Sequence, residues 1–270
     1  MIDRQVRFPG KGRELDGYLA LPGGAGRRPA VVVIQEIWGL DEHIREVARR
    51  LAGEGYVALA PDLYTGELRQ VMARDRIVAA MTFLRQAPPE IQRDPSRIEA
   101  LIAERSAEEQ PGLRALLRVM GPAQREAFAL DLVAALAFLG SLPEVDSGRL
   151  ASLGFCLGGG LSARLATLAP ELACCVIFYG ENPPLEEVPR IQAAVLGLYG
   201  GEDSRITDRV PEFVEAMRRA GKSLEHHVYA GAAHAFFNDT RPSHHPEAAA
   251  DAWRRVLDFL SRCGTGGNGG

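Results

Sequence analysis

The sequence lacks long apolar runs. No stretch approaches the roughly 18 uninterrupted apolar residues that a membrane-spanning helix requires. Residues 1–24, MIDRQVRFPGKGRELDGYLALPGG, also lack the apolar core of a signal peptide. These absences argue against a membrane protein and predict a cytoplasmic one.

Positive charge is not in excess either. The chain has 31 Lys and Arg against 35 Asp and Glu, a formal net charge of -4. Without a broad cationic field the protein has little to hold a nucleic acid backbone, so no nucleic acid partner is expected. Lys11 and Lys222 are the only lysines, a bias that we attribute to genome composition rather than to anion binding.

Cysteine is scarce. The four cysteines, Cys156, Cys174, Cys175 and Cys263, show neither the CxxC spacing of a zinc site nor the density of a disulfide-stapled domain. The sequence therefore predicts free thiols and no metal site.

Short apolar runs alternating with helical patterns fill most of the chain. With 46% hydrophobic residues among 270, the protein can bury a substantial core. Helical patterns occur at 41–55, 121–141, 209–222 and 246–262. Runs that are apolar throughout and alternate with helices indicate an α/β fold with a mostly parallel central sheet and helices on both faces. Strands are expected at 4–8, 15–21, 30–34, 56–60, 149–155, 173–180, 193–200 and 224–230, the first two as an antiparallel edge hairpin.

Two segments do not fit the alternation of strand and helix. Residues 65–120 are longer than a crossover between strands needs, and they read as charged amphipathic helices broken by prolines. We expect an extra helical segment there, either a cap over a pocket or a decoration of the sheet. Residues 264–270 are mostly glycine and are expected to form a flexible tail.

The stretch LGFCLGGG at 153–160 sets Cys156 between two glycines after an apolar run. Strand, sharp turn and helix in this order are typical of a nucleophile elbow, G-x-S-x-G, here with cysteine in place of serine. Gly154 and Gly158 would leave room in the tight turn, and the start of the next helix favours a thiolate. A buried structural cysteine is the alternative.

An elbow of this kind requires an acid and then a histidine further along the chain. LGLYGGEDSRI places Asp203 just beyond a strand, and VYAGAAHAFFN places His234 after the last strand. These side chains can meet Cys156 at the carboxyl edge of the sheet, with His234 as base and Asp203 orienting it. Glu202 and Asp208 are the alternative acids.

Five motifs in a fixed order point to one protein family. With these motifs the sequence resembles the dienelactone hydrolases, a branch of the α/β-hydrolase fold. The resemblance implies a single α/β-hydrolase domain over residues 1–263, with the helical segment as an insertion. The motifs are VVIQEIWGL (32–40), APDLY (60–64), GFCLGGG (154–160), YGGEDSRI (199–206) and GAAHAFFND (231–239).

The resemblance also assigns catalytic roles. It implies a triad of Cys156, His234 and Asp203, and it adds Glu36, which in such enzymes contacts the resting thiol and helps to deprotonate it when substrate arrives. A carboxylate beside a thiol raises the pKa of that thiol, which keeps the sulfur neutral and less prone to oxidation.

Further residues are expected around the nucleophile. Backbone N–H groups of Ile37 and Leu157 would form the oxyanion hole. Trp38, Tyr64 and Phe155 are expected to line the pocket.

One position departs from the family pattern. Enzymes that act on the dienelactone hold its carboxylate with arginines, one of them four residues after the catalytic histidine, and here that position is Asn238. An amide cannot replace a bidentate guanidinium. Arg241 is a candidate substitute, and so is Arg74, Arg76 or Arg85 from the helical segment. Asn238 itself is a candidate substrate contact.

These features together predict a hydrolase of small-molecule carboxylic esters or lactones that works through a thioester acyl-enzyme, with no cofactor. Two alternatives stay open: a non-catalytic ligand-binding member of the fold, and a hydrolase of another acyl substrate such as a thioester. The triad does not decide between them, because selectivity lies in the pocket.

Overall fold

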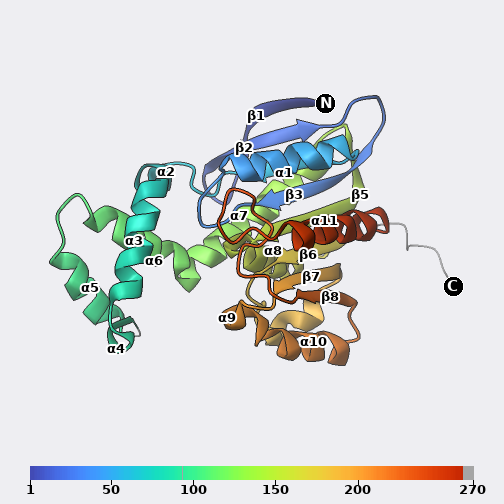
Figure 1. Ribbon diagram of the computed structural model, residues 1–270. Coiled ribbons are helices and arrows are strands. Elements are labelled where there is room, and N and C mark those ends of the chain that lie inside the picture. The colour runs from blue at the N-terminus through green and yellow to red at the C-terminus, as the bar shows by residue number, and fades with distance from the viewer. Residues whose placement is uncertain (93, 264–270) are drawn as a thin grey trace.

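A computed structural model describes residues 1–92 and 94–263 of the chain (Figure 1). The predicted tail at 264–270 lies outside the described residues.

An eight-stranded sheet forms the centre of the protein. Its strand order is β1-β2-β4-β3-β5-β6-β7-β8. β1 pairs antiparallel with β2 and β2 with β4, whereas all the other neighbours are parallel. This confirms the mostly parallel sheet and the antiparallel edge hairpin. The strands are β1 (Ile2–Pro9), β2 (Glu14–Leu21), β3 (Arg28–Ile34), β4 (Val57–Pro61), β5 (Val145–Phe155), β6 (Cys174–Phe178), β7 (Ala194–Gly200) and β8 (Leu224–Tyr229).

Helices cover both faces of the sheet, as predicted (Figure 1). On one face, α1 (Glu42–Gly53) and α11 (Pro246–Ser261) bury their apolar sides in one core cluster. On the other face, α7 (Pro122–Ser141), α8 (Leu157–Leu168) and α10 (Val210–Arg219) form part of a second cluster. The short helices η1 (Leu185–Arg190) and α9 (Ser204–Thr207) lie in the connections around β7.

Local sequence explains where α1 begins and which side it buries. Asp41 caps the helix, since its side chain accepts a hydrogen bond of 3.2 Å from the backbone N–H of Ile44. Ile44, Val47 and Leu51 recur at helical spacing and are buried against the sheet. The helix therefore fixes the β3–α1 loop, which carries Glu36, at the carboxyl edge of the sheet.

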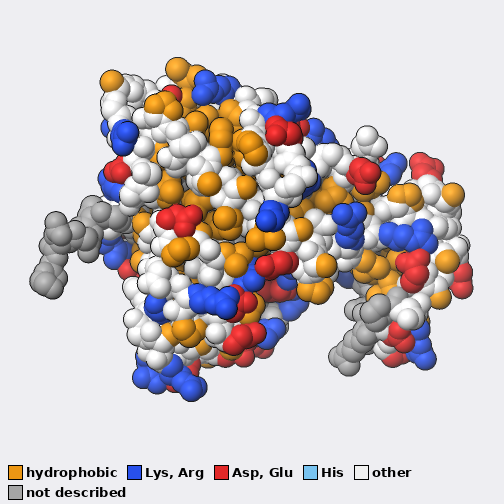
Figure 2. Space-filling model, turned by 180° about the vertical axis from the view of Figure 1, so that it is seen from behind, with side chains coloured by type: hydrophobic (Ala, Val, Ile, Leu, Met, Phe, Trp, Pro, Cys, Tyr) orange, Lys and Arg blue, Asp and Glu red, His pale blue; other side chains and the backbone are white. Residues whose placement is uncertain are grey.

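Residues 65–120 contain a group of helices that projects to one side of the sheet (Figure 1). Ile77 of α3 and Leu116 of α6 are fully buried and belong to the same cluster as α7 and α8. In the reverse view, apolar side chains lie at the junction between this helical segment and the rest of the protein (Figure 2). The helices are α2 (Glu67–Val71), α3 (Arg74–Gln86), α4 (Pro89–Gln92), α5 (Pro95–Ala103) and α6 (Gln110–Met120).

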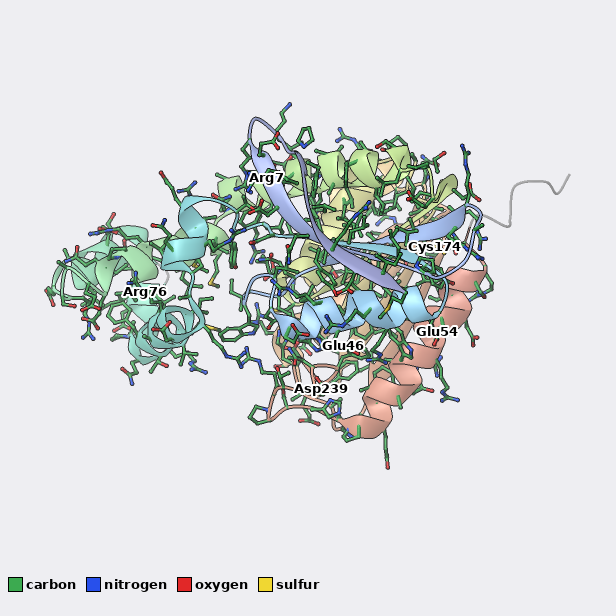
Figure 3. The ribbon with its side chains drawn as sticks, turned by 90° about the horizontal axis from the view of Figure 1, so that it is seen from above. Arg7, Glu46, Glu54, Arg76, Cys174 and Asp239 are labelled. Atoms are coloured by element: carbon green, nitrogen blue, oxygen red, sulfur yellow. A yellow bond between two sulfur atoms is a disulfide. The ribbon has the colours of Figure 1, made fainter. Side chains whose placement is uncertain are left out.

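The expectation that all four thiols are free is wrong for two of them. Cys174, at the start of β6, and Cys263, just after α11, form a disulfide with a Cα–Cα distance of 5.9 Å. Cys174 lies toward the end of the molecule where the C-terminal helix ends (Figure 3). The pair is 89 residues apart in sequence, so no local spacing motif could reveal it. Cys156 and Cys175 are free.

No helix in residues 1–92 and 94–263 is long and apolar enough to span a membrane.

Candidate active site

Cys156 stands in a strained turn between β5 and α8, with φ 55° and ψ -115°. Its backbone N–H donates a 3.0 Å hydrogen bond to the Phe178 carbonyl. A Cβ added at Gly154 would lie 1.9 Å from the Gly158 oxygen, and one at Gly158 would lie 2.4 Å from the Gln35 oxygen. Only glycine fits at either position, which is the steric reason for the G-x-C-x-G pattern. The turn leaves Cys156 partly exposed.

His234 and Asp203 form a close pair beside this cysteine. His234 Nδ1 is 2.5 Å from Asp203 Oδ2, and Asp203 is buried. Burial alone would lower the pKa of His234, but hydrogen bonds to Asp203 and Cys156 outweigh it and raise that pKa to about 10. The alternative acids Glu202 and Asp208 are exposed. The structure therefore brings together the three residues that the sequence analysis grouped.

Glu36 is almost completely buried at the same site. Its Oε2 accepts a 2.7 Å hydrogen bond from Asn238 Nδ2, while its Oε1 has no partner in the described part of the chain. Burial raises the pKa of Glu36, and the Asn238 hydrogen bond offsets only part of that rise. Asn238 is held in turn, since its Oδ1 accepts from the backbone N–H and the hydroxyl of Thr240 at 3.0 Å and 2.7 Å.

The two residues whose amides are expected to form an oxyanion hole both line the same cavity as Cys156. Ile37 and Leu157 line it, and within the described residues neither backbone N–H has an acceptor in the protein. The Ile37 loop is fixed from behind, because the Tyr64 hydroxyl donates a 2.8 Å hydrogen bond to the Ile37 carbonyl. Burial raises the pKa of Tyr64, so this hydroxyl keeps its proton.

The cavity above Cys156 has a volume of about 710 Å³. Of the residues expected around the substrate, Trp38, Arg85 and Arg241 line it. Its other walls come from α3 and α6 of the helical segment, from α7 and from the loops after β6, β7 and β8. The remaining lining residues are Glu36, Ile37, Met81, Leu116, Met120, Arg125, Cys156, Leu157, Gly160, Tyr179, Glu181, Arg205, Ile206, His234, Ala235, Pro242 and Ser243.

Three residues expected to contact substrate lie outside this cavity. Phe155 is fully buried and stacks on Phe237 with ring centroids 5.4 Å apart, because alternation along β5 turns it into the core. Tyr64 lies behind the Ile37 loop, and Asn238 is fully buried against Glu36. The structure corrects the expected position of all three, and Tyr64 and Asn238 hold other site residues instead.

The sequence analysis missed four ionisable residues of the cavity: Tyr179, Glu181, Arg125 and Arg205. Tyr179 follows β6, and its buried hydroxyl has no hydrogen-bond partner among the described residues. Its ring meets that of His234 edge to face, with centroids 5.1 Å apart. Burial, and then the nearby Glu36 and Cys156, raise the pKa of Tyr179 far above its usual value. Arg125 and Arg205 both form ion pairs with Glu181. In the sequence, these residues are marked only by their position after a strand or in a helix near the elbow.

Backbone strain gathers at this cavity. Among the described residues, the non-glycine positions with positive φ are Cys156 (55°), Tyr179 (38°) and Ala235 (62°). All three line the cavity. Such conformations cost free energy and persist where the surrounding structure fixes them, commonly at functional sites.

Two cavity arginines stand apart from the ion pairs. Arg241 lies over the Trp38 ring at 3.7 Å from its centroid, and its buried Nη2 has no hydrogen-bond partner in residues 1–92 and 94–263. Within the described residues, neither Arg241 nor Arg85 forms a salt bridge, whereas Arg125 and Arg205 share Glu181. The cavity thus offers two guanidinium groups that form no salt bridge in the part of the chain that the structure describes.

The residues at this site can carry out nucleophilic acyl transfer. They supply a thiol, a paired base, a buried carboxyl group and two free amide donors around one cavity. Across residues 1–92 and 94–263, no group of three or more His, Cys, Asp or Glu could hold a metal ion.

Three comparisons with known proteins give results that agree with one another. The family model described as Dienelactone hydrolase family matches residues 15–264. A provisionally named carboxymethylenebutenolidase of Saccharolobus solfataricus is 38% identical over 97% of this chain and 99% of its own length. A provisionally named dienelactone hydrolase of Klebsiella pneumoniae subsp. pneumoniae has a similar structure, with TM-score 0.71, 31% identity and coverage of 97% and 98%. A dienelactone hydrolase-like promiscuous phosphotriesterase from metagenomic libraries matches with TM-score 0.71 and 26% identity over the same shares.

Proposed function

Since this chain belongs to the dienelactone hydrolase family and is a hydrolase, we propose that it cleaves carboxylic esters or lactones through a thioester formed on Cys156. The observation that carries the proposal is the His234–Asp203 pair beside a cysteine held in a strained turn. A buried structural cysteine would need neither partner.

In the first half of the reaction, the Cys156 proton passes to His234 and Sγ attacks the carbonyl carbon. The negative charge that develops on the carbonyl oxygen is stabilised by the N–H groups of Ile37 and Leu157. The bond to the alcohol oxygen then breaks, and His234 gives its proton to that oxygen. This leaves the acyl group as a thioester on Cys156.

In the second half, water attacks the thioester carbonyl and passes a proton to His234. The carbon–sulfur bond breaks, the carboxylic acid leaves, and His234 returns the proton to Cys156. Asp203 fixes the orientation of the imidazole through both halves, because it accepts a hydrogen bond from Nδ1.

We assign Glu36 the role that the family resemblance implies, deprotonation of Cys156 when substrate arrives. Its raised pKa makes the carboxylate a stronger base than an exposed glutamate. Its Oε1 has no partner among the described residues and can accept the thiol proton, which then passes on to His234 for the steps above.

We assign Arg241 and Arg85 to the binding of a negatively charged group of the substrate. They take the place of the arginine that the family carries where this chain has Asn238. Support comes from their position in the cavity and from the lack of an acidic partner in the described structure. The Trp38 ring under Arg241 holds the guanidinium in place.

We also propose a cytoplasmic location, which requires the Cys174–Cys263 disulfide to resist reduction there. Cytoplasmic thiols are mostly kept reduced. Cys174 and Cys263 are buried, 2% and 5% exposed, so a reductant reaches the bond only when the C-terminal helix opens. Fractionation of cells tests the location, and recovery from a secreted fraction would contradict it.

The experiment for the catalytic role is steady-state hydrolysis of p-nitrophenyl acetate and of a dienelactone by wild type and by Cys156→Ala. We expect the variant to lose turnover by at least about a thousandfold and to keep its fold, since the nucleophile is gone. Cys175→Ala is the matched control, because Cys175 is the other free cysteine and is fully buried away from the cavity. Retained turnover in Cys156→Ala would overturn the proposal.

A further inference from the structure

The helical segment supplies one wall of the active-site cavity, and that wall is mostly apolar. Met81 and Arg85 of α3 line the cavity, and so do Leu116 and Met120 of α6. Each pair is four residues apart, so each helix presents two side chains, one turn apart, on a single face. Three of the four side chains are apolar, and the cation Arg85 is exposed.

The cavity that this wall encloses is larger than a small acyl group can fill. The cavity measures about 710 Å³, within the roughly 300–1,000 Å³ of pockets that bury drug-sized ligands. An acetyl group attached to Cys156 would leave most of the wall in contact with water. Met120 is 46% exposed. Methionine side chains are flexible and pack well against apolar ligands, so this exposed surface can receive one.

The triad geometry indicates which part of an ester faces this wall. In the tetrahedral intermediate, the carbonyl carbon carries Sγ, the oxyanion, the leaving oxygen and the acyl chain. Cys156, Ile37, Leu157 and His234, which line the cavity, serve the first three groups. The acyl chain is the fourth group, and the α3–α6 wall offers it three apolar side chains and holds none of the groups that serve the other three.

We propose that the α3–α6 wall is an acyl-binding site, and that the preferred substrates are esters with an acyl chain of about six to ten carbons or an aromatic acyl group of similar size. This inference rests on the proposed function, and it gives the helical segment the role of a specificity cap. The apolar part of the acyl group packs on Met81, Leu116 and Met120, while the reacting carbonyl stays at Cys156. Arg85, on the same wall, keeps its assigned role toward a negatively charged group when the acyl group carries one.

The test compares p-nitrophenyl acetate, butyrate, hexanoate and octanoate below their solubility limits, so that the leaving group is constant. Wild-type kcat/KM is expected to rise by about two- to fourfold for each methylene until the wall is covered. A second series of alkyl acetates, with the chain on the alcohol side, is expected to show no comparable rise.

Variants locate the effect on the wall. Met81→Gln/Met120→Gln keeps side-chain volume close to native at two partly exposed positions that line the cavity, so it is expected to fold. It should lower the ratio of octanoate to acetate kcat/KM by at least about tenfold, because amide groups replace apolar contacts. Val78→Gln, at a 47% exposed position of α3 outside the cavity, is the control and should keep the wild-type ratio.

The outcomes separate this inference from the proposed function. Acetate hydrolysis that depends on Cys156, together with a flat or falling dependence on acyl length, would overturn the acyl-binding wall and leave the hydrolase standing. A rise only in the alkyl acetate series, or a chain-length preference that survives in the double variant, would overturn it as well. Ester hydrolysis that persists in Cys156→Ala would remove both.

Discussion

The Asn238 side chain occupies a position where the family pattern has an arginine, yet it does not face the cavity. It donates a 2.7 Å hydrogen bond to Glu36 and is itself held by Thr240. An amide fixes the carboxyl group without neutralising it, whereas a guanidinium would lower the pKa of that carboxyl. Asn238 is therefore a positioning residue that leaves Glu36 with the raised pKa of a buried acid.

Replacing Asn238 by leucine tests this role. The variant leaves Glu36 Oε2 unpaired, so we expect kcat/KM to fall by about tenfold. In the Glu36→Gln background the same replacement should cost little more, because the two residues act as one unit. A double-mutant cycle on kcat/KM measures this coupling, and additive losses from the two single variants would contradict the role of Asn238 in positioning Glu36.

At the residue scale, the sequence predicts a site residue best when that residue directly follows a strand of the sheet. Asp203 and His234 could be paired before the structure was known, because each follows a strand whose carboxyl end meets the elbow. Tyr179 could not be found in this way, since its place depends on a positive φ after β6. Cys174 and Cys263 escaped because a contact across 89 residues leaves no local pattern.

At the scale of elements, the loop after β4 supports the loop after β3 that carries Ile37. The Tyr64 hydroxyl bonds to the Ile37 carbonyl at 2.8 Å. Next to it, the Leu63 backbone N–H donates a 3.1 Å hydrogen bond to Gln35 Oε1. The two loops form one hydrogen-bonded unit, so a change that touches no substrate can still shift the Ile37 amide.

Tyr64→Phe removes one of these bonds and keeps the ring. A single neutral hydrogen bond contributes about 0.5–1.5 kcal/mol, so we expect kcat to fall by roughly two- to tenfold with a smaller change in KM. The control is Tyr199→Phe, because the Tyr199 hydroxyl is also buried but has no partner in the described structure. A loss of kcat that is equal in both variants would contradict the supporting role of Tyr64.

The order and type of the strands and helices around the sheet could be predicted from the sequence. The arrangement of the helices in the helical segment could not. Apolar runs alternating with amphipathic helices allow few arrangements other than a parallel sheet covered on both faces. Residues 65–120 lack such a constraint, because short helices broken by prolines can pack in many ways. Only the structure shows that Met81 and Leu116 reach the cavity of Cys156.

At the scale of the whole molecule, the disulfide ties the C-terminal helix to the sheet. Cys174 begins β6, so the bond lies at the amino end of that strand, whereas the active site lies at the carboxyl ends. Removing the disulfide should therefore lower Tm without changing catalysis. The bond restricts the unfolded chain, and its loss leaves the cavity unchanged.

The variant Cys174→Ala/Cys263→Ala is expected to lose about 2–4 kcal/mol of the free energy of unfolding, while kcat/KM at 25 °C stays within about twofold of wild type. Denaturant titration of both proteins measures the loss. Cys175→Ala, which removes a single buried thiol at the next position, should lose less. Equal unfolding midpoints with equal slopes for the double variant and wild type would contradict a stabilising bond.

The central claim, a thioester on Cys156, is tested most directly by trapping it. Wild type mixed with p-nitrophenyl butyrate is quenched in acid within the first turnover, digested and examined by mass spectrometry. We predict a butyryl adduct on the peptide that contains Cys156, absent from the peptide that contains Cys175 and absent altogether in Cys156→Ala. Turnover without an adduct on Cys156 under conditions that slow deacylation, or an adduct on a different residue, would contradict the account.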